Sequence, residues 1–283
     1  MDNINNNNNK TPIHILITAG GTSEKIDDVR RITNSGTGRL GALICEAFAA
    51  SGQPARITYL CSASAVRPRI ASSRSLGQAI DSDGVSLHAV IADDVLELQE
   101  AVARLGAENT YDIIVHSMAV GDYRMKAVSD AERVSDEVVK RLSYLACGDS
   151  SAPEEAIRDA ILSPPRILES KISSDKENLI VLLEKAPKII SMLRGLAPSA
   201  VIVGFKLLSG VDEAELVRVG TALLQKNDCD FVLANDMRTV RSNRQEGVLI
   251  ARDGGTEHAY GKSGIADLIV KRTLETLKGV RHE

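Results

Sequence analysis

Short apolar runs alternate with amphipathic stretches along most of this chain. The apolar runs predict strands, and the stretches with apolar residues every three or four positions predict helices. The predicted strands are Ile13–Thr18, Ala55–Cys61, Ser86–Ile91, Tyr111–His116, Ala200–Phe205 and Asp230–Leu233. The predicted helices between them are Leu40–Ala50, Asp93–Leu105 (with Asp93 as its cap) and Asp212–Gln225. This alternation predicts an α/β fold, a Rossmann-like and mostly parallel sheet with helices on both faces.

Two segments break the alternation. The stretch of about 126–170 is long and charged, contains three prolines, and predicts two short helices near Asp136–Leu145 and Pro153–Ile161. Inserted into a sheet protein, such a segment is typical of a lid, a flap or an interface arm. Near the end, Gly247–Ala251 and Glu257–Tyr260 flank Asp253-Gly254-Gly255 and predict a β-hairpin, followed by a helix over Lys262–Leu277. We therefore predict a disordered, Asn-rich tail over 1–12 and one Rossmann-like domain over 13–283 with that insertion.

Composition narrows the function classes. The 283 residues carry a net charge of −4, aromatic residues make up 3%, and there is no Trp. This balance argues against nucleic acid as a partner, because general attraction to phosphate and aromatic stacking platforms are both missing. The apolar runs are much shorter than the roughly 20 residues of a membrane helix, and the N-terminus lacks the apolar core of a signal peptide. The four cysteines form no CxxC pair, which favours a reducing, cytoplasmic location.

Two glycine clusters lie close to the first predicted strand. Gly20-Gly21-Thr22 follows the strand directly, and Gly36-Thr37-Gly38 opens the first predicted helix. Backbone N–H groups at such a strand end and helix N-terminus commonly bind an anion, most often a phosphate. The structural alternative is a glycine-rich turn that only lets the helix pack closely on the strand.

Gly36, Gly38 and Gly41 match the GxGxxG spacing of dinucleotide-binding proteins. In that motif, however, the glycines follow the strand directly and an acidic residue ends the second strand. Here some fifteen residues separate strand and glycines, and the second strand ends in Cys61-Ser62. The Tyr-x-x-x-Lys pair of short-chain reductases is also missing. An NAD(P)-dependent reductase therefore remains an alternative that the motif supports weakly.

Other predicted strand ends carry polar residues, each with a structural alternative. Asn34 could cap the helix or position a reacting carbonyl or amine through its amide. Asp122 could cap a turn or accept hydrogen bonds from a ligand. Lys171, at the end of the insertion, could neutralise phosphate charge or be a solvated surface lysine. Phe205 could stack on a base or belong to the core. The five histidines show no metal-ligand spacing.

Taken together, these motifs resemble the phosphopantothenate–cysteine ligase family, and most closely its monofunctional bacterial form. The matching segments are ITAGGTSEKIDDVRRITNSGTGRLG, HSMAVGDY, KISS, EKAPKII, GFKLL and AND, in this order from Ile13 to about Leu277. The resemblance implies a ligase of coenzyme A biosynthesis that uses CTP or ATP with Mg²⁺. Such an enzyme activates the carboxylate of 4′-phosphopantothenate as an acyl-nucleotide and then transfers the acyl group to the amine of L-cysteine. It also implies small-molecule substrates, a homodimer, and an insertion that often acts as a flap.

The resemblance also implies roles for particular residues. Lys171 matches the lysine needed to form the acyl-nucleotide, and Asn34 matches the asparagine needed in the second half-reaction. Residues matching nucleotide contacts are His116, Ser117, Met118, Asp122, Pro187, Lys188, Ile189, Ile190, Phe205 and Lys226. Residues expected to bind phosphate or substrate are Gly20, Gly21, Thr22, Asp27, Arg30, Gly36, Thr37 and Gly38.

Two departures from the family pattern bear on nucleotide choice and on activity. The family histidine after the asparagine is Ser35 here, and a nucleotide-binding lysine of fused bacterial enzymes falls on Ala222. Lys206, found in the monofunctional group, could supply the missing charge in the nucleotide site. These departures leave CTP and ATP both open and keep a non-catalytic nucleotide-binding homologue as a further alternative.

Overall fold

The computed structural model describes residues 11–70, 84–146, 152–241 and 245–280. They belong to two compact units, which we describe separately. The sheet unit comprises Met1–Thr22, Ser35–Val120 and Lys188–Glu283, and the ribbon unit comprises Ser23–Asn34 and Gly121–Pro187. The ribbon unit thus contains the predicted insertion of about 126–170 and extends beyond it on both sides.

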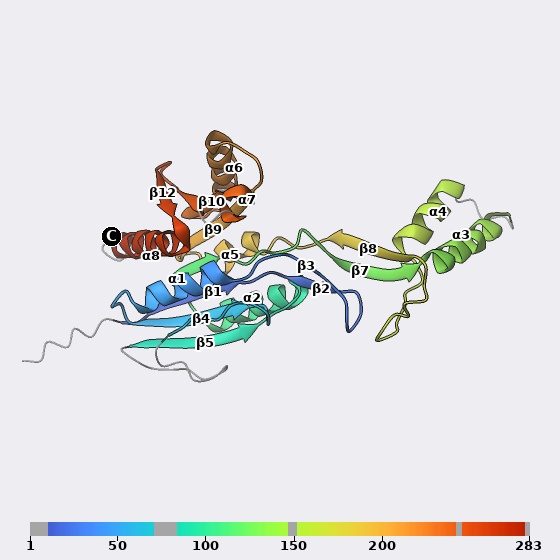
Figure 1. Cartoon of the computed structure of the whole chain (residues 1–283), viewed down its shortest axis with the longest axis horizontal. Coiled ribbons are helices and arrows are strands. Elements are labelled where there is room, and N and C mark those ends of the chain that lie inside the picture. Colours follow the sequence, from blue (N-terminus) through green and yellow to red (C-terminus); the bar gives the residue numbers. More distant parts are fainter. Residues whose placement is uncertain (1–10, 71–83, 147–151, 242–244, 281–283) are drawn as a thin grey trace, which may run out of the picture. The chain divides into compact units, whose positions relative to one another are not determined.

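The sheet unit is built on one eight-stranded sheet in the order β12-β11-β10-β9-β6-β1-β4-β5. Its strands are β1 (Ile13–Ala19), β4 (Ala55–Cys61), β5 (Val85–Ile91), β6 (Ile113–His116), β9 (Val201–Leu208), β10 (Phe231–Asp236), β11 (Glu246–Ala251) and β12 (Thr256–Tyr260). The six strands from β5 to β10 pair in parallel, and β11 and β12 form an antiparallel edge. The predicted α/β fold and the terminal hairpin are confirmed (Figure 1).

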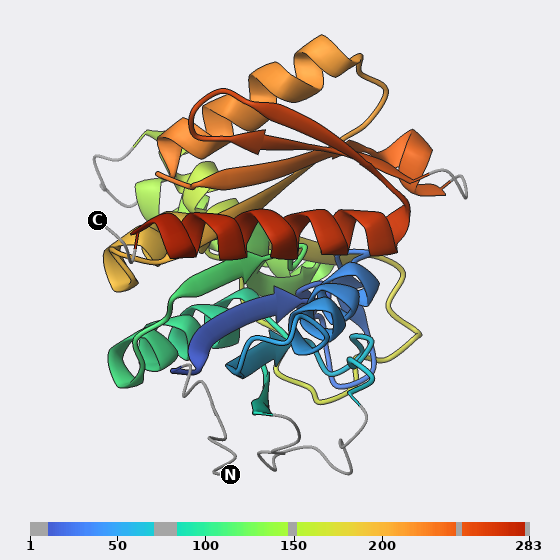
Figure 2. The same cartoon turned by 90° about the vertical axis from the view of Figure 1, so that its left-hand side faces the viewer.

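Helices cover both faces of this sheet. On one face α1 (Arg39–Ala49) packs beside α8 (Gly261–Val280), and Figure 2 shows α8 in red next to α1. The core of this face combines alternate residues of β1, such as Ile15 and Ile17, with Phe48 of α1 and Ile265 of α8. Alternate residues point to opposite faces of a strand, so the apolar run of β1 serves both layers.

The remaining helices of the sheet unit are α2 (Val95–Glu108), α5 (Ile190–Leu196), α6 (Glu213–Lys226) and α7 (Met237–Arg241). α6 lies on the face opposite α8, where Gly220 lets it approach Val232 and Ala234 of β10. One predicted cap is wrong: Asp94, not Asp93, caps α2 by accepting the N–H of Glu97 at 2.8 Å. Asp93 instead accepts the N–H of Ala63 at 2.7 Å.

The ribbon unit contains two antiparallel ribbons and two helices. β2 (Ser23–Lys25) pairs with β3 (Arg31–Thr33), and β7 (Tyr123–Asp130) pairs with β8 (Leu179–Lys185). α3 (Ala131–Ala146) and α4 (Pro153–Leu162) lie close to the two predicted helices. The unit has its own small apolar cluster, Val128, Ile167 and Ile172. Among the described residues, no helix is long and apolar enough to span a membrane.

Candidate functional site

The loops after β1 and β6 are joined at the carboxyl edge of the parallel sheet. Ala119 donates its N–H to the carbonyl of Gly20 at 2.8 Å, and Thr22 donates its N–H to the carbonyl of Ala119 at 3.1 Å. Gly21 and Ala119 form a parallel bridge. The segment after β1 is therefore fixed at the edge where ligands of open α/β sheets bind.

The glycine clusters are needed for two different reasons. Gly20 and Gly38 have φ of 97° and 73°, the left-handed region that favours glycine. At Gly36 a Cβ would run into the carbonyl of Gly20, and at Gly41 it would lie 2.7 Å from the Cβ of Ala19. Gly41 therefore serves close packing of α1 on β1, whereas Gly20 and Gly38 shape the chain at the end of β1 and at the start of α1. Anion binding by these glycines stays a prediction.

The N-terminus of α1 lies directly behind this turn. Its N-cap residue is Gly38, so no side chain caps the helix. The first N–H groups of a helix have no intrahelical partner and attract negative charge. Thr37 is exposed beside this helix start, and the anion that the sequence predicted to bind here stays a prediction.

Ser62, which the sequence reasoning passed over, faces the same turn. It directly follows β4, is 1% exposed, and its Oγ is the nearest atom to a Cβ built on Gly20. Among the described residues this hydroxyl has no hydrogen-bond partner. A buried hydroxyl without a partner is costly, and it calls for an explanation. A single serine after a strand carries no pattern that could have singled it out.

His116 ends β6 and is buried together with Met118. Its Nδ1 lies 2.9 Å from Oγ1 of Thr18, and Met118 donates its N–H to the same oxygen. Ser117 donates its hydroxyl to the carbonyl of Thr18 at 2.6 Å. Burial lowers the pKa of His116 to about 4. His116 is therefore a neutral imidazole at neutral pH, able to donate or accept a hydrogen bond but carrying no charge for a phosphate.

Predicted nucleotide residues also gather around β9. Gly204 leaves room for Ile190, whose Cδ1 would lie 3.0 Å from a Cβ at that position. Ile189 is buried and Lys188 is exposed at the start of α5. Phe205 and Lys206 follow Gly204 along β9 and are half-buried. The sequence-predicted segments before α5 and within β9 are therefore neighbours in the fold.

Lys226 is not brought together with these residues. It ends α6, the helix that returns from the carboxyl end of β9 to the start of β10. A crossover helix runs antiparallel to the strands it connects, so its last residue lies near their amino ends. The structure thus places Lys226 toward the opposite edge of the sheet from His116.

The ribbon unit holds both predicted catalytic residues. Asn34 follows β3 directly and is half-buried, and Lys171 is exposed in the loop before β8. Asp27 and Arg30, predicted to bind substrate, form an ion pair at 2.7 Å in the turn between β2 and β3. At the base of the β7–β8 ribbon, the carbonyl of exposed Asp122 accepts the N–H of Ala186, the residue before Pro187. The predicted site residues are thus distributed over both units.

The part of the chain that the structure describes shows no protein-held metal centre. Among the described residues, no group of three or more His, Cys, Asp or Glu side chains could hold a metal ion. The described side chains therefore do not form a set of protein ligands that would hold a metal ion by themselves. Mg²⁺ commonly keeps several waters and binds through substrate phosphates, so a magnesium ion brought by a nucleotide does not need one.

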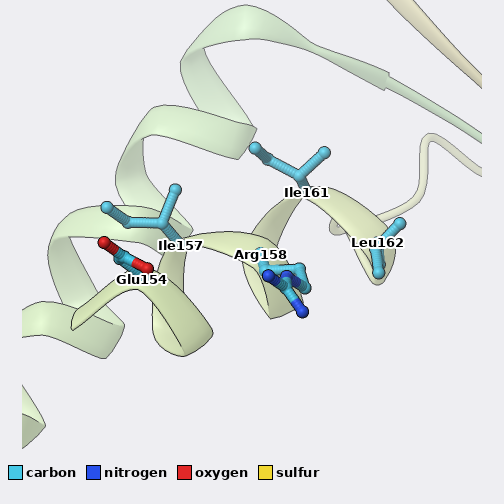
Figure 3. Close-up of a pocket in the computed structure, with 5 residues that line it drawn as sticks. All are labelled: Glu154, Ile157, Arg158, Ile161 and Leu162. Carbon is cyan, nitrogen blue, oxygen red and sulfur yellow. The ribbon is translucent and has the colours of Figure 1, made fainter. Parts of the chain in front are cut away.

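A separate hollow of about 370 Å³ lies on α4 of the ribbon unit. Figure 3 shows its lining, in which Ile157 and Ile161 project to one side of the helix while Arg158 and Leu162 project to another. Glu154 completes the lining. None of the sequence-predicted site residues belongs to this hollow.

These features define the class of the protein. It is a Rossmann-like α/β protein with a glycine-shaped strand-to-helix turn at the carboxyl edge of its sheet, an arrangement typical of nucleotide binding. The family model for the DNA/pantothenate metabolism flavoprotein C-terminal domain matches residues 11–143 and 159–277. The chain belongs to this family, and the resemblance to phosphopantothenate–cysteine ligases found in the sequence is confirmed.

Named relatives agree with this assignment. The coenzyme A biosynthesis bifunctional protein CoaBC of Thermococcus kodakarensis is 27% identical over 239 residues, covering 84% of this chain and 45% of that protein. The human phosphopantothenate–cysteine ligase is 23% identical over 239 residues, covering 81% of this chain and 73% of that protein. The chain thus spans about half the length of the CoaBC relatives that it matches.

Solved structures show the same fold. The DNA/pantothenate metabolism flavoprotein from Streptococcus pneumoniae superposes with a TM-score of 0.67 at 28% identity, covering 93% of this chain and 99% of that one. The Cab2 mutant H337A in complex with phosphopantothenate-cysteine gives a TM-score of 0.63 at 19% identity, covering 95% and 88%. At that identity the second likeness speaks for the fold alone.

Proposed function

We propose that this protein joins 4′-phosphopantothenate to L-cysteine through an acyl-nucleotide intermediate, with CTP or ATP as the activating co-substrate. One observation carries the proposal: the family match over 11–143 and 159–277 includes every residue that the sequence assigned to the site. These residues range from Gly20 to Lys226 and include Asn34 and Lys171. The glycine turn around Gly20 and Gly38 provides a setting that supports phosphate binding.

The reaction follows from the chemistry of a carboxylate, which is a poor acyl donor. A carboxylate oxygen attacks the α-phosphorus of the nucleotide, the bond to the leaving pyrophosphate breaks, and a mixed anhydride forms. The cysteine amine then attacks the acyl carbon, loses a proton, and displaces the nucleoside monophosphate. The protein contributes positioning and charge neutralisation in both steps.

In this mechanism the two predicted catalytic residues act in different steps. The ammonium of Lys171 offsets the negative charge that builds on the phosphates during the first step. The amide of Asn34 orients the activated acyl group during the second step by donating and accepting hydrogen bonds. Mg²⁺ is part of the proposal only as a companion of the triphosphate, and no protein ligand is assigned to it.

The decisive experiment separates the half-reactions. We expect purified protein with phosphopantothenate, L-cysteine, Mg²⁺ and either CTP or ATP to release pyrophosphate and form phosphopantothenoylcysteine. Lys171→Ala should block pyrophosphate release, whereas Asn34→Ala should release pyrophosphate and accumulate the acyl-nucleotide. Lys140→Ala, an exposed lysine of α3, is the control that keeps parental turnover. A block of Lys171→Ala and Asn34→Ala at the same step would contradict the roles.

The competing functions give different outcomes in the same preparation. A non-catalytic homologue would bind CTP or ATP without releasing pyrophosphate. A reductase would bind NADPH saturably. Two features argue against a reductase: β2 and β3 intervene between β1 and α1, and Ser62 follows β4 at the position where a ribose-binding acid is expected. We therefore expect no saturable NADPH binding.

A homodimer and a cytoplasmic location complete the proposal. Family resemblance supports both, and the buried thiols of Cys45, Cys61 and Cys229 are compatible with a reducing compartment. Light scattering coupled to size exclusion should give twice the mass of one chain, and a monomeric mass would remove the dimer from the proposal.

A further inference from the structure

The carboxylate at the end of β7 binds the chain on both sides of the insertion. Asp130, the last residue of β7, caps α3 by accepting the N–H of Arg133 on Oδ1 at 2.9 Å. Its Oδ2 forms an ion pair with Nζ of Lys176 at 2.7 Å. Lys176 lies in the loop that leads into β8, after α3 and α4 have been completed. One side chain therefore fixes both the start of α3 and the loop that follows the insertion.

This ion pair is shielded from solvent on its acidic side. The side chain of Asp130 is 6% exposed, whereas that of Lys176 is 25% exposed. The ammonium of Lys176 and the N–H of Arg133 favour the charged carboxylate more than burial disfavours it, and they hold the pKa of Asp130 below its usual range. Salt screens a partly buried pair much less than an exposed one. The pair is therefore formed at neutral pH and restrains the loop.

The chain that follows α4 also binds the end of β7 through its backbone. Ile167 donates its N–H to the carbonyl of Val128 at 2.8 Å, and Ser129 donates its hydroxyl to the carbonyl of Pro165 at 2.7 Å. Asp130 is the next residue of β7, so three successive residues of one strand hold the returning chain. The loop that carries the predicted catalytic lysine therefore lies between two attachments to the same strand end.

Two residues hold this loop, and Lys171 lies beside the first of them. Ile172 is 2% exposed and packs in the apolar cluster of the ribbon unit. In the stretch 173–178 every residue is exposed except Lys176, which is half-buried. Lys171 itself is exposed. The apolar cluster thus fixes the backbone next to Lys171, and the ion pair with Asp130 restrains the otherwise exposed stretch that follows.

We propose that Asp130 and Lys176 form a latch that positions Lys171 for acyl-nucleotide formation. The inference rests on the proposed function for the role of Lys171, whereas the latch itself rests on the contacts above. Asp130 is a positioning residue, because a buried carboxylate does not bind a phosphate. An open latch lets the loop move, and displacement of a reacting group by about 1 Å can lower a rate by roughly 100-fold.

Asp130→Asn and Lys176→Met open the latch from its two sides. Asn caps a helix as well as Asp does, so Asp130→Asn keeps the cap of α3 and removes only the charge that Lys176 binds. We expect each variant to lower kcat for pyrophosphate release by about tenfold, with Kd for the triphosphate and KM for phosphopantothenate within about twofold of the parent. The double variant should be no slower than the slower single variant, because both changes remove the same interaction.

The comparison of the two variants separates positioning from direct substrate binding. If the ammonium of Lys176 contacted a phosphate, Lys176→Met would lower activity or raise Kd. Asp130→Asn would then free the same ammonium for the ligand and keep or raise activity. Such a divergence between the two variants, or a double variant whose losses simply add, would overturn the latch.

Two further variants control for changes in loop charge and in the stability of the insertion. Glu177→Gln changes the charge of the exposed residue next to Lys176. Arg141→Met breaks the ion pairs of α3 with Glu137 and with Asp159 of α4. Both should keep the parental kcat. A tenfold loss in Arg141→Met would show that any loosening of the insertion slows the reaction, and it would contradict a specific role of the latch.

A measurement that needs no turnover tests the latch by itself. A glutamate-specific protease can cut after Glu177, and the masses of the fragments identify that cut. Cleavage there should be at least about fivefold faster in native Asp130→Asn and Lys176→Met than in the parent. If the parent released no pyrophosphate but showed this difference, the ligase function would fail and the latch would stand. Equal cleavage in the parent and the variants, or a parental kcat in a variant that is cut faster, would overturn the proposal. If Asp130→Asn does not fold, Lys176→Met carries the comparison of kcat, Kd and cleavage.

Discussion

Thr18 and His116 form a hydrogen-bonded pair in which Oγ1 of Thr18 lies 2.9 Å from Nδ1 of His116. The same oxygen accepts the N–H of Met118 at 3.2 Å. The hydroxyl of Thr18 can donate to Nδ1 or accept from it, so the tautomer of His116 decides which of the two groups donates. Thr18 therefore fixes the orientation of the buried imidazole at the end of β6.

The first prediction concerns pH and stability. Burial lowers the pKa of His116 to about 4, whereas an unfolded histidine titrates near 6.5. Between these values the unfolded chain binds more protons, so stability is full near pH 7 and falls as the pH drops toward 4. Moving from pH 7 to pH 5 should lower the free energy of unfolding by about 2 kcal/mol through His116 alone.

Urea unfolding at pH 7 and pH 5 measures this loss. We expect His116→Gln to lose less free energy of unfolding between the two pH values than the parent does. His88→Gln, at an exposed position of β5, is the control and should follow the parent. Equal losses in His116→Gln and the parent would show that His116 does not titrate as described.

The second prediction concerns Gly36. A Cβ at this position would collide with the carbonyl of Gly20 and lie 2.9 Å from Cβ of Ala119. Because the obstacle includes backbone, Gly36→Ala must displace the glycine turn, at a cost of about 1–3 kcal/mol. We expect a lower Tm and weaker triphosphate binding. At Gly264 in α8 a Cβ meets nothing within 4 Å. Gly264→Ala should therefore raise the free energy of unfolding by up to about 1 kcal/mol. A Gly36→Ala variant as stable as the parent would contradict the close approach.

The strands and helices of the sheet unit could be predicted because their apolar periodicity is local. β4 has the predicted bounds of Ala55–Cys61, because its buried residues Ala55, Ile57 and Tyr59 alternate with Arg56 and Thr58. The ribbons could not be found in this way. β2 and β3 have three residues each, and β7 carries Arg124 and Lys126 among its apolar residues. What stabilises the first ribbon is the distant contact of Asp27 with Ile172, which no local pattern contains.

The candidate functional site, too, could be predicted only where the signal is local in the sequence. Sequence motifs selected the glycines around Gly20 and Gly38, because backbone conformation constrains residue type there. Lys226 was selected by the family resemblance, and a linear sequence does not show that α6 returns its last residue toward the amino ends of the strands. Its contact with a nucleotide stays a prediction. Sequence motifs missed Ser62, whose position beside Gly20 follows only from the pairing of β4 with β1.

The third prediction concerns Ser62. Its hydroxyl is buried and has no partner among the described residues, so Ser62→Ala removes no hydrogen bond of the free protein. We expect the free energy of unfolding to stay equal or rise. If ligand binding supplies the missing partner, the rise in Tm caused by CTP should be smaller in the variant. Ser64→Ala, at an exposed position of the same loop, should show the same CTP-induced rise in Tm as the parent. A destabilised Ser62→Ala with an unchanged CTP effect would assign the hydroxyl a purely structural role.

The last prediction compares two lysines that the sequence placed in one nucleotide site. Lys206 lies on β9 after Phe205, whereas Lys226 ends α6 toward the opposite edge of the sheet. Loss of one charge-assisted contact to a phosphate costs roughly 1.5–3 kcal/mol, which is about tenfold or more in Kd. We therefore expect Lys206→Ala to raise Kd for CTP or ATP by at least about tenfold. Lys226→Ala also removes one lysine charge, but at the far edge of the sheet. It should change Kd by less than about twofold, since screening weakens a charge beyond roughly 8–10 Å. Calorimetric titration of both variants with both nucleotides decides the matter. Equal effects of the two substitutions would mean that the nucleotide does not bind at the carboxyl edge of the sheet.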